Sequence, residues 1–327
     1  MTNPLAAFRH LRETLFGVTS TNRLFLVSQG QGWHNVEPSW FLIFGIPGSA
    51  QAAADRPTGE RVTVQRAMRY DLTSRITGRQ YRIDVSTPFQ AEPDRKFPVF
   101  YVLDGNWYFL AATGCVTEAG DTMTPAIVVG IGYPTDDNEE VGRRRVLELT
   151  PDSGQKTWGH NRAGGGDEFI RVLLEEVKPF VEARCRIDGT QQSLYGKSLG
   201  GLMVLRALFR YPGAFQNYIA ASPAIWWDRR AVLADEAEFS VRARAGSLRL
   251  RLLVMSASGE RYEGFDPKLR ERSESDRMIE NAAELAIRLG ALAPGRISVR
   301  YTNIPGETHV SASLAELGRA LNFALKP

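Results

Sequence analysis

The feature that most constrains this chain is a short apolar segment, a glycine-flanked serine and an apolar helix pattern in direct succession. Residues 194–209 read LYGKSLGGLMVLRALF, and Ser198 is the central residue of G-K-S-L-G. This order predicts a strand, a tight turn and a helix, with the serine in strained backbone that pushes its hydroxyl out above a sheet. The following helix directs its positive end at the same place. The pattern therefore predicts that Ser198 is a nucleophile.

The same letters also match the end of a phosphate-binding loop, G-x-x-x-x-G-K-[ST]. That loop requires glycine at position 191, where this chain has Gln191, and Gly189 comes two residues too early. The expected strand Ser193–Tyr195 also leads directly into the turn, so no loop is left to wrap a phosphate. The nucleotide-binding interpretation is excluded.

Strand and helix patterns alternate from residue 62 onward. Compact apolar runs predict fully buried central strands, and Arg79–Thr87 alternates polar and apolar residues as a half-buried edge strand does. This alternation predicts an α/β fold with a mostly parallel sheet and helices on both faces, and reactive groups at the carboxyl ends of the strands. The expected buried strands are 98–103, 126–131, 193–195 and 250–255, and the expected helices are 167–181, 199–209, 279–289 and 312–325.

Composition bounds the class of protein. Of 327 residues, 43% are hydrophobic and 24% are charged, which is typical of globular proteins, and a net charge of +3 gives no general attraction to nucleic acid. Cys115 and Cys185 cannot form a disulfide framework, and we expect two reduced thiols. We expect an N-terminal extension over residues 1–60 and a catalytic domain over residues 61–327.

The expected cellular location of the protein depends on one N-terminal segment. Residues 40–46 (WFLIFGI) are apolar and residues 50–52 (AQA) have the form of a signal-peptidase site, but His34 and Glu37 stand where an export signal has basic residues. No run reaches the roughly 18–20 apolar residues of a membrane span. We expect a cytoplasmic protein, and a periplasmic or secreted one if residues 40–52 act as an export signal.

A serine nucleophile needs a base, and histidine is the usual one near neutral pH. In this architecture the base follows the serine in the chain, and of four histidines only His309 does, between an expected strand at 297–303 and the last helix. The orienting acid is expected in the loop after strand 250–255, which contains Glu260, Glu263 and Asp266. We favour Glu263, which would reach past the turn at Gly259, with Glu260 as the alternative.

The negative oxygen that forms when a serine attacks a carbonyl group needs two preorganised backbone N–H donors. The first is expected from Leu199, directly after the nucleophile. The second is expected from Asn106 in the segment VLDGNWYF after a buried strand, where Gly105 permits a close turn.

Several segments together resemble a known family. They are DLTSRITGRQYRIDV (71–85), VFYVLDGNW (99–107), PAIVVGIGYP (125–134), RVLELTP (145–151), GGDEFIRVLLEEVKP (165–179), the Ser198 turn and SPAIWW (222–227). The chain resembles the esterase-D-like branch of the α/β-hydrolases, and within it the ferric-enterobactin trilactone hydrolases, over residues 62–327. The resemblance implies the α/β-hydrolase fold and a serine esterase that acts on a siderophore or related ester.

Carried over to this sequence, the resemblance implies Ser198 as nucleophile, His309 as base, and the Asn106 and Leu199 amides as oxyanion donors. It also implies a substrate-side role for Arg145. Two positions depart from the family pattern, because Lys197 replaces the histidine often found before the serine and Glu148 stands where aspartate is usual.

Aromatic residues give further substrate-binding candidates. Trp107 lies beside the expected oxyanion loop, and Trp227 follows a strand-like segment together with Trp226, where core packing is the alternative. The histidines and cysteines lack metal-ligand spacing, so no metal or cofactor is expected, and the expected partner is a small-molecule ester. An acyltransferase, a carbohydrate or thioester esterase, and a catalytically silent siderophore-binding protein remain alternatives, and the sequence leaves the oligomeric state open.

Overall fold

The structure of the protein is a computed structural model that describes residues 63–89, 94–261, 267–268, 271 and 276–326. These residues belong to one compact unit, Thr63–Pro327. The predicted extension over residues 1–60 lies outside the described residues. No helix in the described ranges is both long and apolar enough to cross a membrane.

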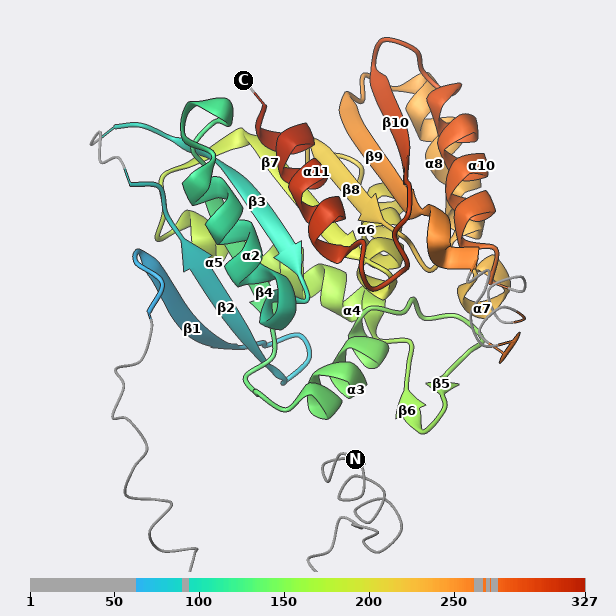
Figure 1. Ribbon diagram of the computed structural model, residues 1–327, viewed down its shortest axis with the longest axis horizontal. Coiled ribbons are helices and arrows are strands. Elements are labelled where there is room, and N and C mark those ends of the chain that lie inside the picture. The colour runs from blue at the N-terminus through green and yellow to red at the C-terminus, as the bar shows by residue number, and fades with distance from the viewer. Residues whose placement is uncertain (1–62, 90–93, 262–266, 269–270, 272–275, 327) are drawn as a thin grey trace, which may run out of the picture. The chain divides into compact units, whose positions relative to one another are not determined.

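Eight strands form one sheet in the order β1-β2-β4-β3-β7-β8-β9-β10 (Figure 1). β2 is antiparallel to both of its neighbours, whereas all the other neighbouring pairs are parallel, so the predicted mostly parallel sheet is confirmed. The strands are β1 (Ala67–Thr73), β2 (Gln80–Ser86), β3 (Phe97–Leu103), β4 (Ile127–Gly132), β7 (Ile187–Lys197), β8 (Asn217–Ala221), β9 (Leu250–Ala257) and β10 (Ile297–Ile304). A separate two-stranded sheet consists of β5 (Thr157–Trp158) and β6 (Asn161–Arg162).

The prediction that Arg79–Thr87 forms an edge strand is wrong. β2 lies between β1 and β4, and its last four residues are buried. The edge position belongs to β1, whose side chains are exposed or half-buried throughout. The alternation of polar and apolar residues in β2 thus belongs to the second strand from the edge of the sheet, and β1 pairs with it on the outer side.

Helices cover both faces of the sheet. Figure 1 shows α2 (Gly105–Glu118) and α11 (Ser313–Leu325) on one face. Adjacent residues of β3 separate accordingly, because Phe100 and Val102 pack with α2 and α11 while Tyr101 and Leu103 pack into the core of the opposite face. Further helical segments in the described ranges include α3 (Asn138–Glu148), α4 (Gly166–Arg171), the π-helical segment Val172–Val177, α5 (Lys178–Glu182), α6 (Leu199–Arg210), α7 (Trp227–Arg230), α8 (Leu233–Ala245) and α10 (Met278–Gly290), with 3₁₀ turns at Gly120–Thr122 and Ser258–Arg261.

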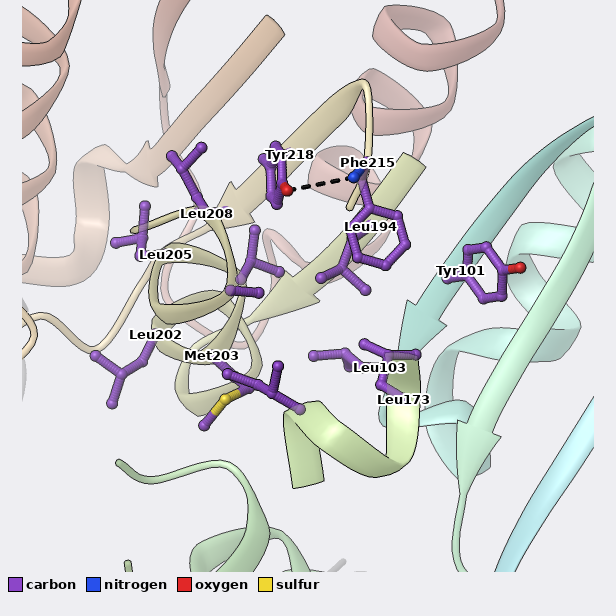
Figure 2. Packing of buried hydrophobic residues seen from close by; sticks show 14 of the residues in the cluster. Tyr101, Leu103, Leu173, Leu194, Leu202, Met203, Leu205, Leu208, Phe215 and Tyr218 are labelled. Atoms are coloured by element: carbon purple, nitrogen blue, oxygen red, sulfur yellow. Dashed lines mark hydrogen bonds between the residues drawn. The ribbon is translucent and has the colours of Figure 1, made fainter. Parts of the chain in front are cut away.

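The helix that follows Ser198 is anchored in the core of this second face. All residues of α6 except Arg210 are buried. Figure 2 shows Leu202, Leu205 and Leu208 of α6 in the same buried cluster as Leu194 of β7 and Tyr218 of β8, with a 3.3 Å hydrogen bond from the Phe215 N–H to the Tyr218 hydroxyl. A helix that is apolar around most of its circumference is expected where protein surrounds it, and its one buried charge, Arg206, is ion-paired with Asp167 and Asp235. Its first turn is therefore held rigidly at the edge of the sheet.

Candidate active site

Ser198 lies in a strained turn between β7 and α6. Its φ of 58° and ψ of −116° belong to a region that non-glycine residues rarely occupy. Its N–H donates to the Ala221 carbonyl at 2.9 Å, and its own carbonyl accepts from the N–H groups of Ala224 (3.0 Å) and Leu202 (2.9 Å). The predicted strand, turn and helix are confirmed, and the adjacent β8 holds the turn in place.

Gly196 is required by the closeness of the chain at this turn. A Cβ on Gly196 would lie 2.3 Å from the Gly200 carbonyl oxygen, which is a backbone atom and cannot move aside. Gly200 in turn faces Asp104, whose Oδ2 lies 3.3 Å from where a Cβ on Gly200 would be. The turn that carries Ser198 therefore lies directly beside the turn that follows β3.

His309 lies in the connection between β10 and α11, and its ring is hydrogen-bonded to Glu260. The distance from His309 Nδ1 to Glu260 Oε1 is 2.7 Å. β9 and β10 are parallel, so the loops that carry the two residues leave the same edge of the sheet. Two hydrogen bonds join these loops, from the Gly259 N–H to the Glu307 carbonyl at 2.7 Å and from the Gly306 N–H to Ser258 Oγ at 2.8 Å.

Glu260 is only 2% exposed and is held in its ionised form. Burial disfavours the charge, but hydrogen bonds from His309, from Ser222 and from the Ala257 N–H outweigh this effect, so the pKa of Glu260 lies below its ordinary value. A carboxylate can only accept, so the proton of the imidazole resides on Nδ1 and Nε2 is left as a base.

Glu260 was the alternative to Glu263 in the sequence, and it is the carboxylate that contacts His309. β9 ends at Ala257, and the 3₁₀ turn Ser258–Arg261 folds the Glu260 side chain back toward the sheet. A carboxylate therefore does not need to reach past the turn at Gly259 to contact His309, because Glu260 already does so. Glu263 and Asp266 lie outside the described residues.

The two amides predicted as oxyanion donors lie in the first turns of two helices. Leu199 begins α6, and Asn106 is the second residue of α2. Within the described part of the chain, neither N–H has a hydrogen-bond acceptor, as expected for first-turn amides. The Asn106 side chain is occupied, since its Oδ1 accepts from the Tyr133 N–H at 2.7 Å and its Nδ2 donates to the Tyr133 and Thr135 carbonyls, both at 3.0 Å.

Arg145 and Trp107 lie beside this second turn. The Arg145 guanidinium forms a two-point ion pair with Asp104, with Nε–Oδ1 and Nη2–Oδ2 distances of 2.9 and 3.0 Å. Its central carbon lies 5.0 Å from the centroid of the Trp107 ring, and Trp107 is 40% exposed. Asp104 has a left-handed φ of 55°, and its carbonyl accepts from the Trp107 N–H at 2.9 Å, so it fixes the turn as well.

The prediction that Trp227 contacts substrate is wrong. Its side chain is 0% exposed and packs in the main core, 5.9 Å from the Trp158 ring in an edge-to-face arrangement. Trp226 is the half-buried member of the pair. Core packing, the alternative for these two tryptophans, is confirmed for Trp227.

The sequence pattern gave no sign of a buried polar cluster next to the site. Lys197, Ser222 and Glu316 are 3%, 1% and 0% exposed. Glu316 forms an ion pair with the Lys197 ammonium through Oε2, and its Oε1 accepts a 2.6 Å hydrogen bond from Ser222 Oγ. The only available signal was the position of Lys197 before Ser198, because Glu316 is 119 residues away from Lys197 in the chain.

Other predicted features involve cysteines and metals. Cys115 and Cys185 are free thiols. Within the ranges that the structure covers, no group of three or more histidine, cysteine, aspartate or glutamate side chains is arranged to hold a metal ion.

Comparison with known proteins agrees with this geometry. A family model described as putative esterase matches residues 74–286. The ferri-bacillibactin esterase BesA of Bacillus subtilis is 33% identical over 270 residues, which cover 78% of this chain and 88% of that protein. The siderophore triacetylfusarinine C esterase of Aspergillus fumigatus is 31% identical over 264 residues, which cover 75% of this chain and 89% of that protein.

A solved structure, that of the BES protein from Bacillus cereus, superimposes with a TM-score of 0.72 at 30% identity, covering 83% of this chain and all of that one. The family model, the sequence relatives and the solved structure thus all point to the same family of esterases. The chain belongs to the esterase family with the α/β-hydrolase fold, and it is an enzyme that acts on ester bonds.

Proposed function

We propose that this esterase hydrolyses ester bonds of a siderophore, with Ser198 as nucleophile, His309 as base and Glu260 as the acid that orients it. The observation that carries the proposal is the pairing of a strained serine turn with the His309–Glu260 hydrogen bond at one edge of the sheet. The names of the relatives support the substrate class, since BesA is named for ferri-bacillibactin and the Aspergillus protein for the siderophore triacetylfusarinine C.

A chain of contacts connects the histidine to the serine turn. Glu260 is hydrogen-bonded to His309 and to the Ala257 N–H at the end of β9, and the Met255 carbonyl of the same strand accepts the Ser222 N–H. Ser222 directly follows Ala221, whose carbonyl accepts the Ser198 N–H. These contacts connect His309, through the end of β9, to the strand end that holds the nucleophile.

In the proposed mechanism, Ser198 Oγ attacks the ester carbonyl while His309 Nε2 takes its proton. Glu260 stabilises the imidazolium that forms. The tetrahedral intermediate then collapses, the bond to the alcohol oxygen breaks, and Nε2 returns its proton to the alcohol. Water repeats the sequence on the acyl-enzyme, and the products are a carboxylic acid and an alcohol.

The negative oxygen of each intermediate would be bound by the Leu199 and Asn106 amides. Both are first-turn amides, so the positive ends of α6 and α2 add to the two hydrogen bonds. The Asn106 side chain stabilises this arrangement indirectly, because it ties the first turn of α2 to the loop after β4.

Arg145 and Trp107 are the substrate-binding residues in this proposal. Asp104 uses two nitrogens of the Arg145 guanidinium, which fixes the plane of that cation beside a partly exposed indole. A fixed cation next to an aromatic face suits an anionic aromatic group, as in a catecholate arm.

The direct test is product analysis. The purified protein is incubated with a cyclic catecholate triester, a cyclic hydroxamate triester and p-nitrophenyl butyrate, the siderophores both iron-free and ferric, and products are resolved by mass spectrometry. We expect ring opening of a siderophore with uptake of one water per ester, and none with Ser198→Ala. Cleavage of only the nitrophenyl ester would refute the substrate class, and transfer of the acyl group to an added alcohol would favour the acyltransferase alternative.

A further inference from the structure

A groove lies between α11 and β10, the last strand of the sheet (Figure 1). Its volume is about 520 Å³, which is within the range of small-molecule sites. Among the described residues that line it, none belongs to the groups proposed for catalysis or for substrate binding. The groove is therefore separate from the site around Ser198.

The groove has walls of mixed character. Arg300 of β10 lies opposite Leu253 of β9, and Leu253 packs in the same cluster as the apolar side chains of α11. Neighbouring residues on paired strands share a face of the sheet, so Arg300 lies on the α11 side. The lining also includes Leu314, which is 67% exposed, Arg319 and Phe323 of α11. Apolar surface and guanidinium groups thus lie next to each other.

A third arginine joins these two at Phe323. The central carbon of the Arg251 guanidinium lies 4.2 Å from the centroid of the Phe323 ring, and its Nη2 donates to the Phe323 carbonyl at 2.8 Å. The central carbon of Arg300 lies 5.8 Å from the same centroid. Arg319 precedes Phe323 by about one turn of α11 and lines the same groove. Positive charge is therefore concentrated around one aromatic ring.

In the described part of the chain, no carboxylate balances these charges. No aspartate or glutamate among the described residues lines the groove, and none of the three arginines forms an ion pair there. Arg206, by contrast, is paired with two aspartates. Burial and the charge of Arg300 lower the pKa of Arg251, so the cations repel each other. A bound anion would relieve that repulsion.

Gly318 leaves the groove open. It lies inside α11, where glycine is less stabilising than alanine. A Cβ at this position would meet no atom within 4 Å, and Gly318 is not among the glycines with positive φ. Neither close packing nor backbone conformation therefore requires glycine here. Because Gly318 lines the groove, its missing side chain leaves room for a ligand.

We propose that the groove between α11 and β10 binds a small organic anion that carries at least two negative charges on an apolar body. Arg251, Arg300 and Arg319 would bind its oxyanion groups, because a guanidinium presents paired N–H donors that match carboxylate and phosphate oxygens. The apolar body would lie on Leu253 and Leu314. Such a ligand is bound independently of the ester substrate.

Isothermal titration calorimetry of the full chain tests this with benzene-1,3,5-tricarboxylate and with its neutral counterpart, benzene-1,3,5-tricarboxamide. We expect saturable binding of one tricarboxylate per chain, with a Kd below about 1 mM, and no binding of the tricarboxamide. Arg300→Gln and Arg319→Gln should each weaken binding by about tenfold, because each removes charge-assisted hydrogen bonds. Gly318→Leu removes no charge but fills the groove, and should abolish binding.

The matched control is Arg184→Gln. Arg184 has surroundings like those of Arg251, since its central carbon lies 3.6 Å from the centroid of the Phe180 ring and its Nη1 donates to the Phe180 carbonyl at 3.0 Å. It lies outside the groove, so its loss should leave the affinity unchanged. Arg184, Arg300 and Arg319 are exposed, so these variants should fold, and thermal unfolding verifies this.

Equal affinity in the wild type and Gly318→Leu would overturn the proposal, because it would show diffuse attraction by a positive surface. The absence of tricarboxylate binding to the wild type would also overturn it. Binding only to a DNA duplex or to phosphatidylglycerol vesicles, and not to the tricarboxylate, would overturn it in favour of a macromolecular or membrane partner.

Discussion

Replacing Glu260 by glutamine removes a charge while keeping the size of the side chain. The carboxylate oxygen lies 2.7 Å from His309 Nδ1, and the imidazole becomes positive in the transition state. Two unit charges about 4 Å apart interact by about 4 kcal/mol at an effective dielectric constant of about 20. Solvent weakens this, because the His309 side chain is 26% exposed. We expect a loss of about 2–4 kcal/mol, or a fall in kcat of about 30- to 1,000-fold.

The assay is kcat on p-nitrophenyl butyrate across pH, with thermal unfolding to verify the fold. The acid limb should also move to lower pH in Glu260→Gln, because the imidazolium loses its negative neighbour. Glu280→Gln is the matched control. Glu280 forms a solvent-exposed ion pair with Arg261, and removing its charge should leave kcat unchanged. A fall of less than threefold in Glu260→Gln, or a larger fall in Glu263→Gln, would refute the assignment of Glu260.

Three further perturbations test the surrounding geometry. Gly196→Ala forces a Cβ to within 2.3 Å of the Gly200 carbonyl oxygen, so the free energy of unfolding in denaturant should fall by about 3 kcal/mol; a change below 1 kcal/mol would contradict the close approach. Asp104→Ala leaves the Arg145 guanidinium without its two-point partner, and should cost about 3–5 kcal/mol of stability and raise KM for a siderophore; unchanged values of both would show that the pair is unimportant. Trp107→Ala removes a side chain that is 40% exposed, so KM should rise while Tm changes little; an unchanged KM would remove Trp107 from the substrate-binding residues.

The serine turn could be predicted because its cause is local. Gly196, Ser198 and the apolar helix are contiguous, and the steric demand of the turn appears in the spacing itself. His309 could be predicted by chain order, since it is the one histidine after the serine. Whole buried strands such as β3 were also predictable, because all seven of its residues are buried and read as one apolar run.

Features that depend on side-chain direction could not be predicted. Trp226 and Trp227 are adjacent and chemically equal, and only the fold determines which one turns inward. The left-handed φ values at 228–230 (40°, 54° and 67°), which turn the chain after Trp227, occur at non-glycine residues and have no sequence signature. The choice between Glu260 and Glu263 likewise depends on the 3₁₀ turn at 258–261.

The buried cluster of Lys197, Ser222 and Glu316 could not be predicted from the sequence for a different reason. Its members come from β7, the end of β8 and α11, and each reads alone as an ordinary surface residue. Only the arrangement of the strands brings Lys197, Ser222 and Glu316 together, and no local pattern encodes that encounter.

Covalent labelling is the sharpest test that Ser198 is the nucleophile and His309 is its base. The protein is treated with a fluorophosphonate, and the modified peptide and the rate of labelling are determined by mass spectrometry for the wild type and for His309→Ala. We expect one adduct per chain at Ser198 in the wild type, and labelling that is at least about 1,000-fold slower in His309→Ala. An adduct at another residue, no adduct at all, or an equal rate of labelling in the two proteins would contradict these roles for Ser198 and His309.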